Sequence, residues 1–109
     1  MNFKIDLNKD GKQIDINIDG EIDAFTAPKL KEAFEPYAGI KDLKVLVDLS
    51  EVTYMDSTGL GVLVGIFKNL RASNGDMTLR GLSDRLKRLF DITGLTDIMN
   101  INSEIEGGV

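Results

Sequence analysis

A short apolar segment followed by a hydroxyl-bearing turn and an amphipathic helix is the feature that most constrains the fold of this chain. Residues 45–49, Val-Leu-Val-Asp-Leu, are too few and too β-branched for a helix and predict a buried strand. Downstream, apolar residues recur at helical spacing at Leu60, Leu63, Val64 and Phe67, with Arg71 at the outer edge. A strand that leads directly into a helix is typical of an α/β domain.

The turn between this strand and helix places Ser57 at a helix start. Free backbone N–H groups and the positive end of the helix dipole gather there, so a phosphate on the Ser57 hydroxyl would be tolerated. Asp56 beside it would make the local charge depend strongly on such a modification. Ser, Thr and Asp are also the ordinary N-cap residues, so the same turn could simply satisfy the first turn of the helix.

The N-terminal part of the chain predicts a hairpin and then a helix. Phe3, Ile5 and Leu7 alternate with polar residues, as do Ile14, Ile16 and Ile18, on either side of a turn at residues 10–11. Thr26 is a candidate N-cap before Pro28 in a first turn, and the helical stripe runs through Leu30, Ala33, Phe34 and Tyr37. Pro36 and Gly39 predict an irregular end for this helix.

The C-terminal part repeats the order of strand and helix. Asn-Gly at residues 74–75 predicts a turn into a strand over 77–80. Ser83 is expected to cap a helix that Gly94 ends, and residues 98–101 predict a last strand. The predicted fold is therefore α/β, with a mixed sheet that starts with an N-terminal hairpin, is parallel in its later part, and carries helices mainly on one face.

The length and composition predict one domain over residues 1–101 and a polar C-terminal tail over 102–109. Charged residues make up 28% of the chain, and no apolar run approaches the roughly 20 residues that a membrane span needs. The first residues lack the apolar segment of a signal peptide. We therefore expect a cytoplasmic protein that does not bind a membrane.

The residue types that are missing exclude several classes of function. The chain has no histidine and no cysteine, which removes the commonest general base, a His-assisted serine nucleophile and thiolate metal sites. A net charge of -5 disfavours binding to a nucleic-acid backbone. We expect no catalytic residue, no metal, no cofactor and no direct nucleic-acid contact.

Three glycines, Gly59, Gly61 and Gly65, superficially resemble a dinucleotide-binding turn. Gly61 and Gly65 share one helix face, where close packing or the approach of a partner explains them better. Asp23, which ends the second hairpin strand, is by its chemistry a turn residue with an Asx-type hydrogen bond. The cluster of Arg85, Lys87 and Arg88 reads as a solvated helix face.

Three segments in register resemble one known family. Residues 52–61, Val-Thr-Tyr-Met-Asp-Ser-Thr-Gly-Leu-Gly, resemble the phosphorylation site of the anti-sigma-factor antagonists, the small STAS-domain proteins of bacterial partner switching. Residues 20–28, Gly-Glu-Ile-Asp-Ala-Phe-Thr-Ala-Pro, and residues 88–95, Arg-Leu-Phe-Asp-Ile-Thr-Gly-Leu, resemble two further family segments. Thr58, where sporulation-type members more often carry a second serine, makes the chain similar to the general-stress-response type of Gram-positive bacteria.

The resemblance implies a STAS fold and a regulatory substrate, not an enzyme. The unphosphorylated protein would bind an anti-sigma factor that is also its serine kinase, and this binding would free a sigma factor. Phosphorylation of Ser57 would abolish binding, and a PP2C-type phosphatase would remove the phosphate again. The implied partner-binding residues are Asp23, Thr26, Asp56, Ser57, Thr58, Gly59, Leu60 and Gly61. A small nucleotide-binding STAS module and an adaptor that is never phosphorylated are the alternatives.

Overall fold

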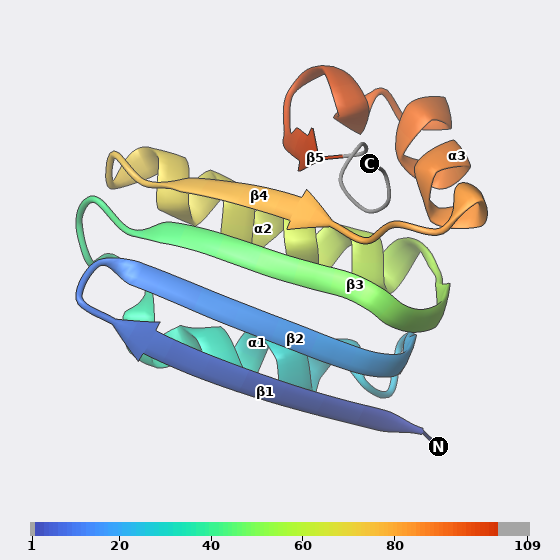
Figure 1. The fold of residues 1–109 in the computed structure, drawn as a ribbon, viewed down its shortest axis with the longest axis horizontal. Helices are drawn as coiled ribbons and strands as arrows, with labels where there is room; N and C mark the ends of the chain where they lie inside the picture. The colour runs from blue at the N-terminus through green and yellow to red at the C-terminus, as the bar shows by residue number, and fades with distance from the viewer. Residues whose placement is uncertain (1, 103–109) are drawn as a thin grey trace.

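A mixed sheet with the strand order β1-β2-β3-β4-β5 organises the chain in the computed structural model, which describes residues 2–102 (Figure 1). Among the strands of residues 2–102, only β1 and β2 pair antiparallel. The pairs β2 with β3, β3 with β4, and β4 with β5 are parallel. The strands are β1 Phe3–Asp10, β2 Gln13–Ile22, β3 Lys44–Met55, β4 Asp76–Arg80 and β5 Asn100–Asn102. The α/β fold that starts with a hairpin is thus confirmed.

Helices α1 Ala27–Phe34 and α2 Ser57–Ala72 lie against the same face of the sheet, and α3 Asp84–Ile92 lies beyond β4 near β5 (Figure 1). The inward residues of the hairpin explain this layering, because Ile14, Ile16 and Ile18 are buried while the residues between them are exposed. The opposite face of β2 and β3 carries polar residues, including Asp15 and Asp48. The core therefore lies between one face of the sheet and the helices α1 and α2, and Leu86 and Phe90 of α3 extend it.

The buried stripe of α2 differs slightly from its prediction. Leu60, Leu63 and Phe67 are buried as expected, but Val64 is only half-buried. The stripe is completed by Ile66 and Leu70, because the helix packs against α1 on one side and the sheet on the other. Arg71 stays exposed, 5.7 Å from the centre of the Phe67 ring.

The predicted helix ends agree with the structure where they depend on local chemistry. The Ser83 hydroxyl accepts a hydrogen bond from the Leu86 N–H at 3.2 Å, so Ser83 is the N-cap of α3. Gly94 has a φ of 78°, the left-handed conformation that ends a helix. The first helix ends irregularly as expected, since the 3-10 turn η1 Glu35–Tyr37 follows α1.

The last strand begins later than predicted. The 3-10 turn η2 Leu95–Asp97 follows Gly94, and its Leu95 carbonyl accepts hydrogen bonds from Ile98 and Met99. These two residues therefore belong to the turn, and β5 starts at Asn100. The predicted tail over residues 102–109 starts one residue too early, because Asn102 is the last residue of β5. Residues 103–109 of this tail lie outside the described residues.

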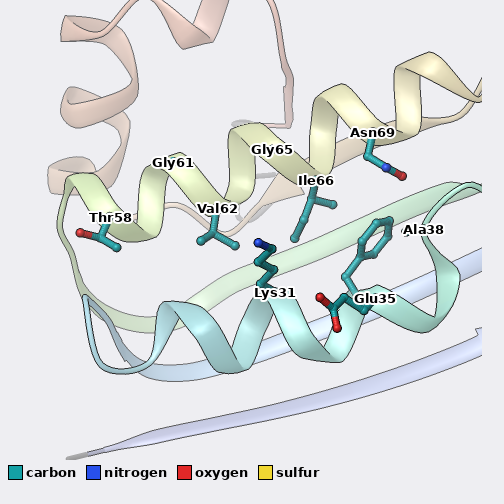
Figure 2. Close-up of a pocket in the computed structure, with 10 residues that line it drawn as sticks. Lys31, Glu35, Ala38, Thr58, Gly61, Val62, Gly65, Ile66 and Asn69 are labelled. Atoms are coloured by element: carbon teal, nitrogen blue, oxygen red, sulfur yellow. The ribbon is translucent and has the colours of Figure 1, made fainter.

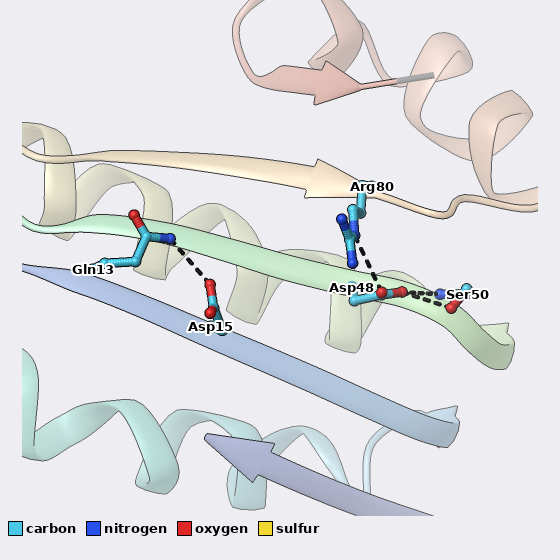
Figure 3. A network of polar contacts seen from close by, with 5 residues as sticks. All are labelled: Gln13, Asp15, Asp48, Ser50 and Arg80. Atoms are coloured by element: carbon cyan, nitrogen blue, oxygen red, sulfur yellow. Dashed lines mark hydrogen bonds and ion pairs between the residues drawn. The ribbon is translucent and has the colours of Figure 1, made fainter. Parts of the chain in front are cut away.

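A polar network crosses the solvated face of the sheet where the end of β4 lies beside the middle of β3 (Figure 3). Asp48 Oδ1 accepts hydrogen bonds from the Ser50 N–H at 2.9 Å and the Ser50 hydroxyl at 2.6 Å, and Asp48 Oδ2 lies 3.2 Å from Arg80 Nε. Partial burial alone would raise the pKa of the Asp48 carboxyl. The hydrogen bonds from Ser50 and Arg80 and the charge of Arg80 outweigh it and hold this pKa below its usual value.

We predict that Ser50→Ala raises the pKa of Asp48 toward its ordinary value, because the substitution removes the hydroxyl donor. Since the folded pKa is depressed, the stabilisation by ionised Asp48 is present above the unfolded pKa of about 4 and is lost as the pH falls through the folded pKa. The measurement is an NMR titration of the Asp48 carboxyl carbon in both proteins. Equal titration midpoints would show that the Ser50 hydroxyl does not hold the pKa down.

Candidate functional site

The carboxyl ends of β2 and β3 lie side by side and bring together the turns that carry Asp23 and Asp56. Ile22 pairs in parallel with Met55, and the Asp56 N–H donates to the Ile22 carbonyl at 3.2 Å. Neighbouring strands are about 4.8 Å apart, so Asp23 and Asp56 leave the sheet as adjacent residues. The site is therefore formed by the loop after β2 and the first turn of α2.

Asp56, and not Ser57, is the N-cap of α2. Its Oδ1 accepts hydrogen bonds from the N–H groups of Thr58 at 3.0 Å and Gly59 at 3.1 Å, and its carbonyl accepts the Leu60 N–H. Ser57 is the first helical residue and is exposed. The expectation of free N–H groups around Ser57 is thus wrong for Thr58, Gly59 and Leu60, because the N–H groups of these residues already donate to Asp56.

Asp23 closes the loop after β2 with an Asx-type turn, as its chemistry predicted. Its Oδ1 accepts hydrogen bonds from the Phe25 N–H at 2.9 Å and the Thr26 N–H at 3.1 Å. The carbonyl of the same residue accepts the Ala27 N–H at 2.8 Å. This loop is held from both ends by one aspartate.

Thr26 occupies the N-cap position of α1, but its side chain makes no capping hydrogen bond. Instead, its hydroxyl donates to the Glu21 carbonyl at 2.8 Å and accepts from the Asp23 N–H at 2.9 Å. Only 1% of Thr26 is exposed. The predicted capping role is wrong because the hydroxyl turns inward to tie the loop to the end of β2.

Exposure divides the predicted partner-binding residues into two groups. Ser57, Thr58 and Gly61 are exposed, and Asp23 and Asp56 are half-buried, so a partner could touch all five. The remaining three, Thr26, Gly59 and Leu60, are buried. A role of these three in binding would have to be indirect, through the shape of the loop and the first turn of α2.

The glycines of α2 face very different surroundings. A Cβ on Gly59 would lie 2.6 Å from Ile22 Cγ2 and 2.7 Å from the Ile22 carbonyl oxygen. A Cβ on Gly61 or Gly65 would meet nothing within 4 Å. Close packing within the domain is therefore required at Gly59 alone, and the packing explanation is wrong for the other two.

Gly61 and Gly65 instead border an open hollow of about 370 Å³ between α1 and α2 (Figure 2). Val62 and Ile66 from α2 lie toward Lys31 and Glu35 of α1 across it (Figure 2). Thr58, one residue after Ser57, lies at one end. The approach of a partner to these glycines stays a prediction.

Phe25 is a candidate site residue that the sequence motifs did not single out. It lies between Asp23 and Thr26 in the loop after β2, and 75% of it is exposed. The signal in the sequence that could have drawn attention to Phe25 is an aromatic residue inside a short turn of polar and small residues. Its exposure alone does not identify a role, because single exposed apolar residues are common on protein surfaces.

Within residues 2–102, none of the helices combines the length and the apolar character needed to cross a lipid bilayer.

The comparisons with known proteins agree with this fold. The family model described as STAS domain matches residues 4–107, so the chain belongs to the STAS domain family. An anti-sigma-B factor antagonist of Listeria monocytogenes is 55% identical over 108 residues, which cover 98% of this chain and 94% of the relative. An anti-sigma-B factor antagonist of Bacillus subtilis is 49% identical over 110 residues, which cover 100% of this chain and 99% of the relative.

A solved structure shares the fold at low sequence identity. The Bacillus cell fate determinant SpoIIAA in its phosphorylated form superposes with a TM-score of 0.76 and 19% identity, covering 94% of this chain and 93% of that one. This likeness shows the fold alone. The curated relatives support the role of an anti-sigma factor antagonist for this chain.

Proposed function

We propose that this protein is the antagonist in a partner switch controlled by phosphorylation of Ser57. In its unphosphorylated form it binds an anti-sigma factor that is also a serine kinase, and the sigma factor is released. Phosphorylation of Ser57 ends this binding, and a PP2C-type phosphatase restores it. The protein acts as a regulatory substrate in this scheme.

The position of Ser57 is the observation that carries the proposal. It is the first residue of α2, it is exposed, and within residues 2–102 its hydroxyl takes part in no hydrogen bond. Asp56 already performs the capping role that would otherwise explain a hydroxyl at this position. An accessible hydroxyl without a structural task is available to an enzyme.

The comparisons supply the class of partner. The relatives from Listeria and Bacillus are named for antagonism of the anti-sigma-B factor, and the structural neighbour SpoIIAA has been solved in a phosphorylated form. By analogy, we assign an anti-sigma factor as the partner and phosphorylation as the control, and the exposed hydroxyl of Ser57 is the acceptor that we propose. The kinase would supply ATP, Mg²⁺ and the catalytic base, because this chain contains no histidine to activate Ser57.

A phosphorylation assay tests this function directly. Incubated with the anti-sigma factor of its own cell and Mg·ATP, the wild-type protein should gain one phosphate by intact mass, and Ser57→Ala should gain none. Ser57→Ala should still bind the anti-sigma factor, because the substitution removes one exposed oxygen and leaves the Asp56 cap in place.

Thr58→Ala is the matched control, because it removes the neighbouring exposed hydroxyl, and it should be phosphorylated like the wild type. Full phosphorylation of Ser57→Ala would refute the assignment of the serine. A wild-type protein that binds the anti-sigma factor but never gains phosphate would identify an adaptor instead. Binding of labelled ATP by the isolated chain would favour a nucleotide-binding module.

A further inference from the structure

The ring of Phe25 is exposed and does not belong to the buried core. At 75% exposure it contributes little to the core, whereas its neighbour Thr26 is almost fully buried. Single exposed apolar residues are common on protein surfaces, so exposure alone identifies nothing. Phe25 is distinguished by how its backbone is held and by where it lies.

The backbone on both sides of Phe25 is fixed by hydrogen bonds. Its own N–H donates to Asp23 Oδ1 at 2.9 Å, and the Thr26 hydroxyl ties the loop to the Glu21 carbonyl at 2.8 Å. The Ala27 N–H donates to the Asp23 carbonyl at 2.8 Å. Because the loop is already ordered, little backbone entropy would be lost when the ring is bound.

The loop that carries Phe25 lies at the same edge of the sheet as Ser57. It follows β2 directly, and the last residue of β2 pairs with Met55 and accepts the Asp56 N–H. Figure 1 shows this loop and the turn into α2 at the same end of the sheet. Phe25 is thus an exposed apolar residue at the same end of the sheet as Asp23, Asp56 and Ser57, and such a mixture is like the apolar centre and polar rim of a protein interface.

We propose that Phe25 is the apolar anchor of this surface: its ring enters an apolar pocket of the anti-sigma kinase, and basic groups around that pocket face Asp23 and Asp56. The charge of this chain supports a basic partner surface. The chain carries a net charge of -5, and Asp23 and Asp56 place two carboxylates at this end of the sheet. The inference rests on the proposed function, because it names a contact within that complex.

The test is a calorimetric titration of the full-length chain into the anti-sigma factor with Mg·ADP, which prevents phosphorylation during the measurement. Phe25→Ala should raise the Kd about 30-fold, the size typical of a buried aromatic anchor at an interface. Phe25→Leu keeps apolar bulk and should raise the Kd less. The melting temperature of both variants should match the wild type, because the ring is outside the core.

Ile98→Ala is the matched control, because Ile98 is 54% exposed and lies between η2 and β5, away from the loop after β2. Its Kd should stay within about twofold of the wild type, the scatter expected for a residue outside the interface.

Unchanged binding of Phe25→Ala to a kinase that binds the wild type would overturn the anchor and leave the proposed function intact. A wild-type protein that does not bind would overturn both. A loss of affinity that comes with an equal loss of melting temperature in both Phe25 variants would assign the ring a structural role and overturn the anchor.

Discussion

Phosphorylation of Ser57 should weaken binding to the anti-sigma kinase by about two decades in Kd while the domain stays folded. A phosphate adds about -1.5 to -2 charges to a surface that already carries Asp56 and Asp23. At about 6 Å from one carboxylate and an effective dielectric near 20, a doubly charged phosphate is repelled by roughly 5 kcal/mol before screening. The phosphate adds bulk where the kinase must fit closely, and its repulsion pushes the Asp56 and Asp23 carboxylates away from the basic groups that they would face. Binding therefore weakens although the partner surface is basic.

The N-cap geometry adds to this effect. The N–H groups of Thr58 and Gly59, which could otherwise have bound the phosphate, already donate to Asp56 Oδ1. A phosphate on Ser57 either competes with Asp56 for these donors or points outward toward the partner. In both cases negative charge accumulates at the exposed end of α2, where the helix dipole offsets only part of it.

Calorimetry with phosphorylated and unphosphorylated protein measures the change in Kd, with Ser57→Asp as a weaker mimic and Ser57→Asn as a neutral control of similar size. Amide chemical-shift differences between the two forms should cluster at residues 20–27 and 55–61 and leave β5 almost unchanged. Asp23→Asn should reduce the repulsion. Equal affinities of the two forms, or shifts spread evenly over the domain, would contradict a local electrostatic switch.

Gly59→Ala should destabilise the domain by about 2 kcal/mol, whereas Gly65→Ala in the same helix should stabilise it by up to about 1 kcal/mol. The added methyl group at Gly59 would lie 2.7 Å from the Ile22 carbonyl oxygen, which belongs to a strand and cannot move aside easily. At Gly65 the methyl group would meet nothing within 4 Å, so only the better helix propensity of alanine counts.

Urea denaturation of the two variants and the wild type measures these free energies of unfolding. The pair is its own control, because both substitutions add one methyl group to α2. A Gly59→Ala protein as stable as the wild type would show that α2 can shift away from β2 at no cost.

The elements of this protein were predictable from short segments of the sequence. Alternation at Ile14, Ile16 and Ile18 predicts which face of β2 is buried, because successive side chains of a strand point to opposite faces. Ser83 and Gly94 mark the two ends of α3 because their effects depend only on nearby backbone groups. The motif around Ser57 likewise indicated an exposed hydroxyl at a helix start.

The roles of individual residues at the site were decided by tertiary structure. Gly59 and Gly65 are the same residue type on one helix, and only the position of Ile22, far away in the chain, requires the first and not the second. Thr26 could have capped α1, but the end of β2 offered its hydroxyl a partner in the interior. Local periodicity encodes which face of a strand or helix is buried. The space around one side chain depends instead on how β2 and β3 align and on where the helices pack. Such long-range contacts leave no periodic pattern in the sequence.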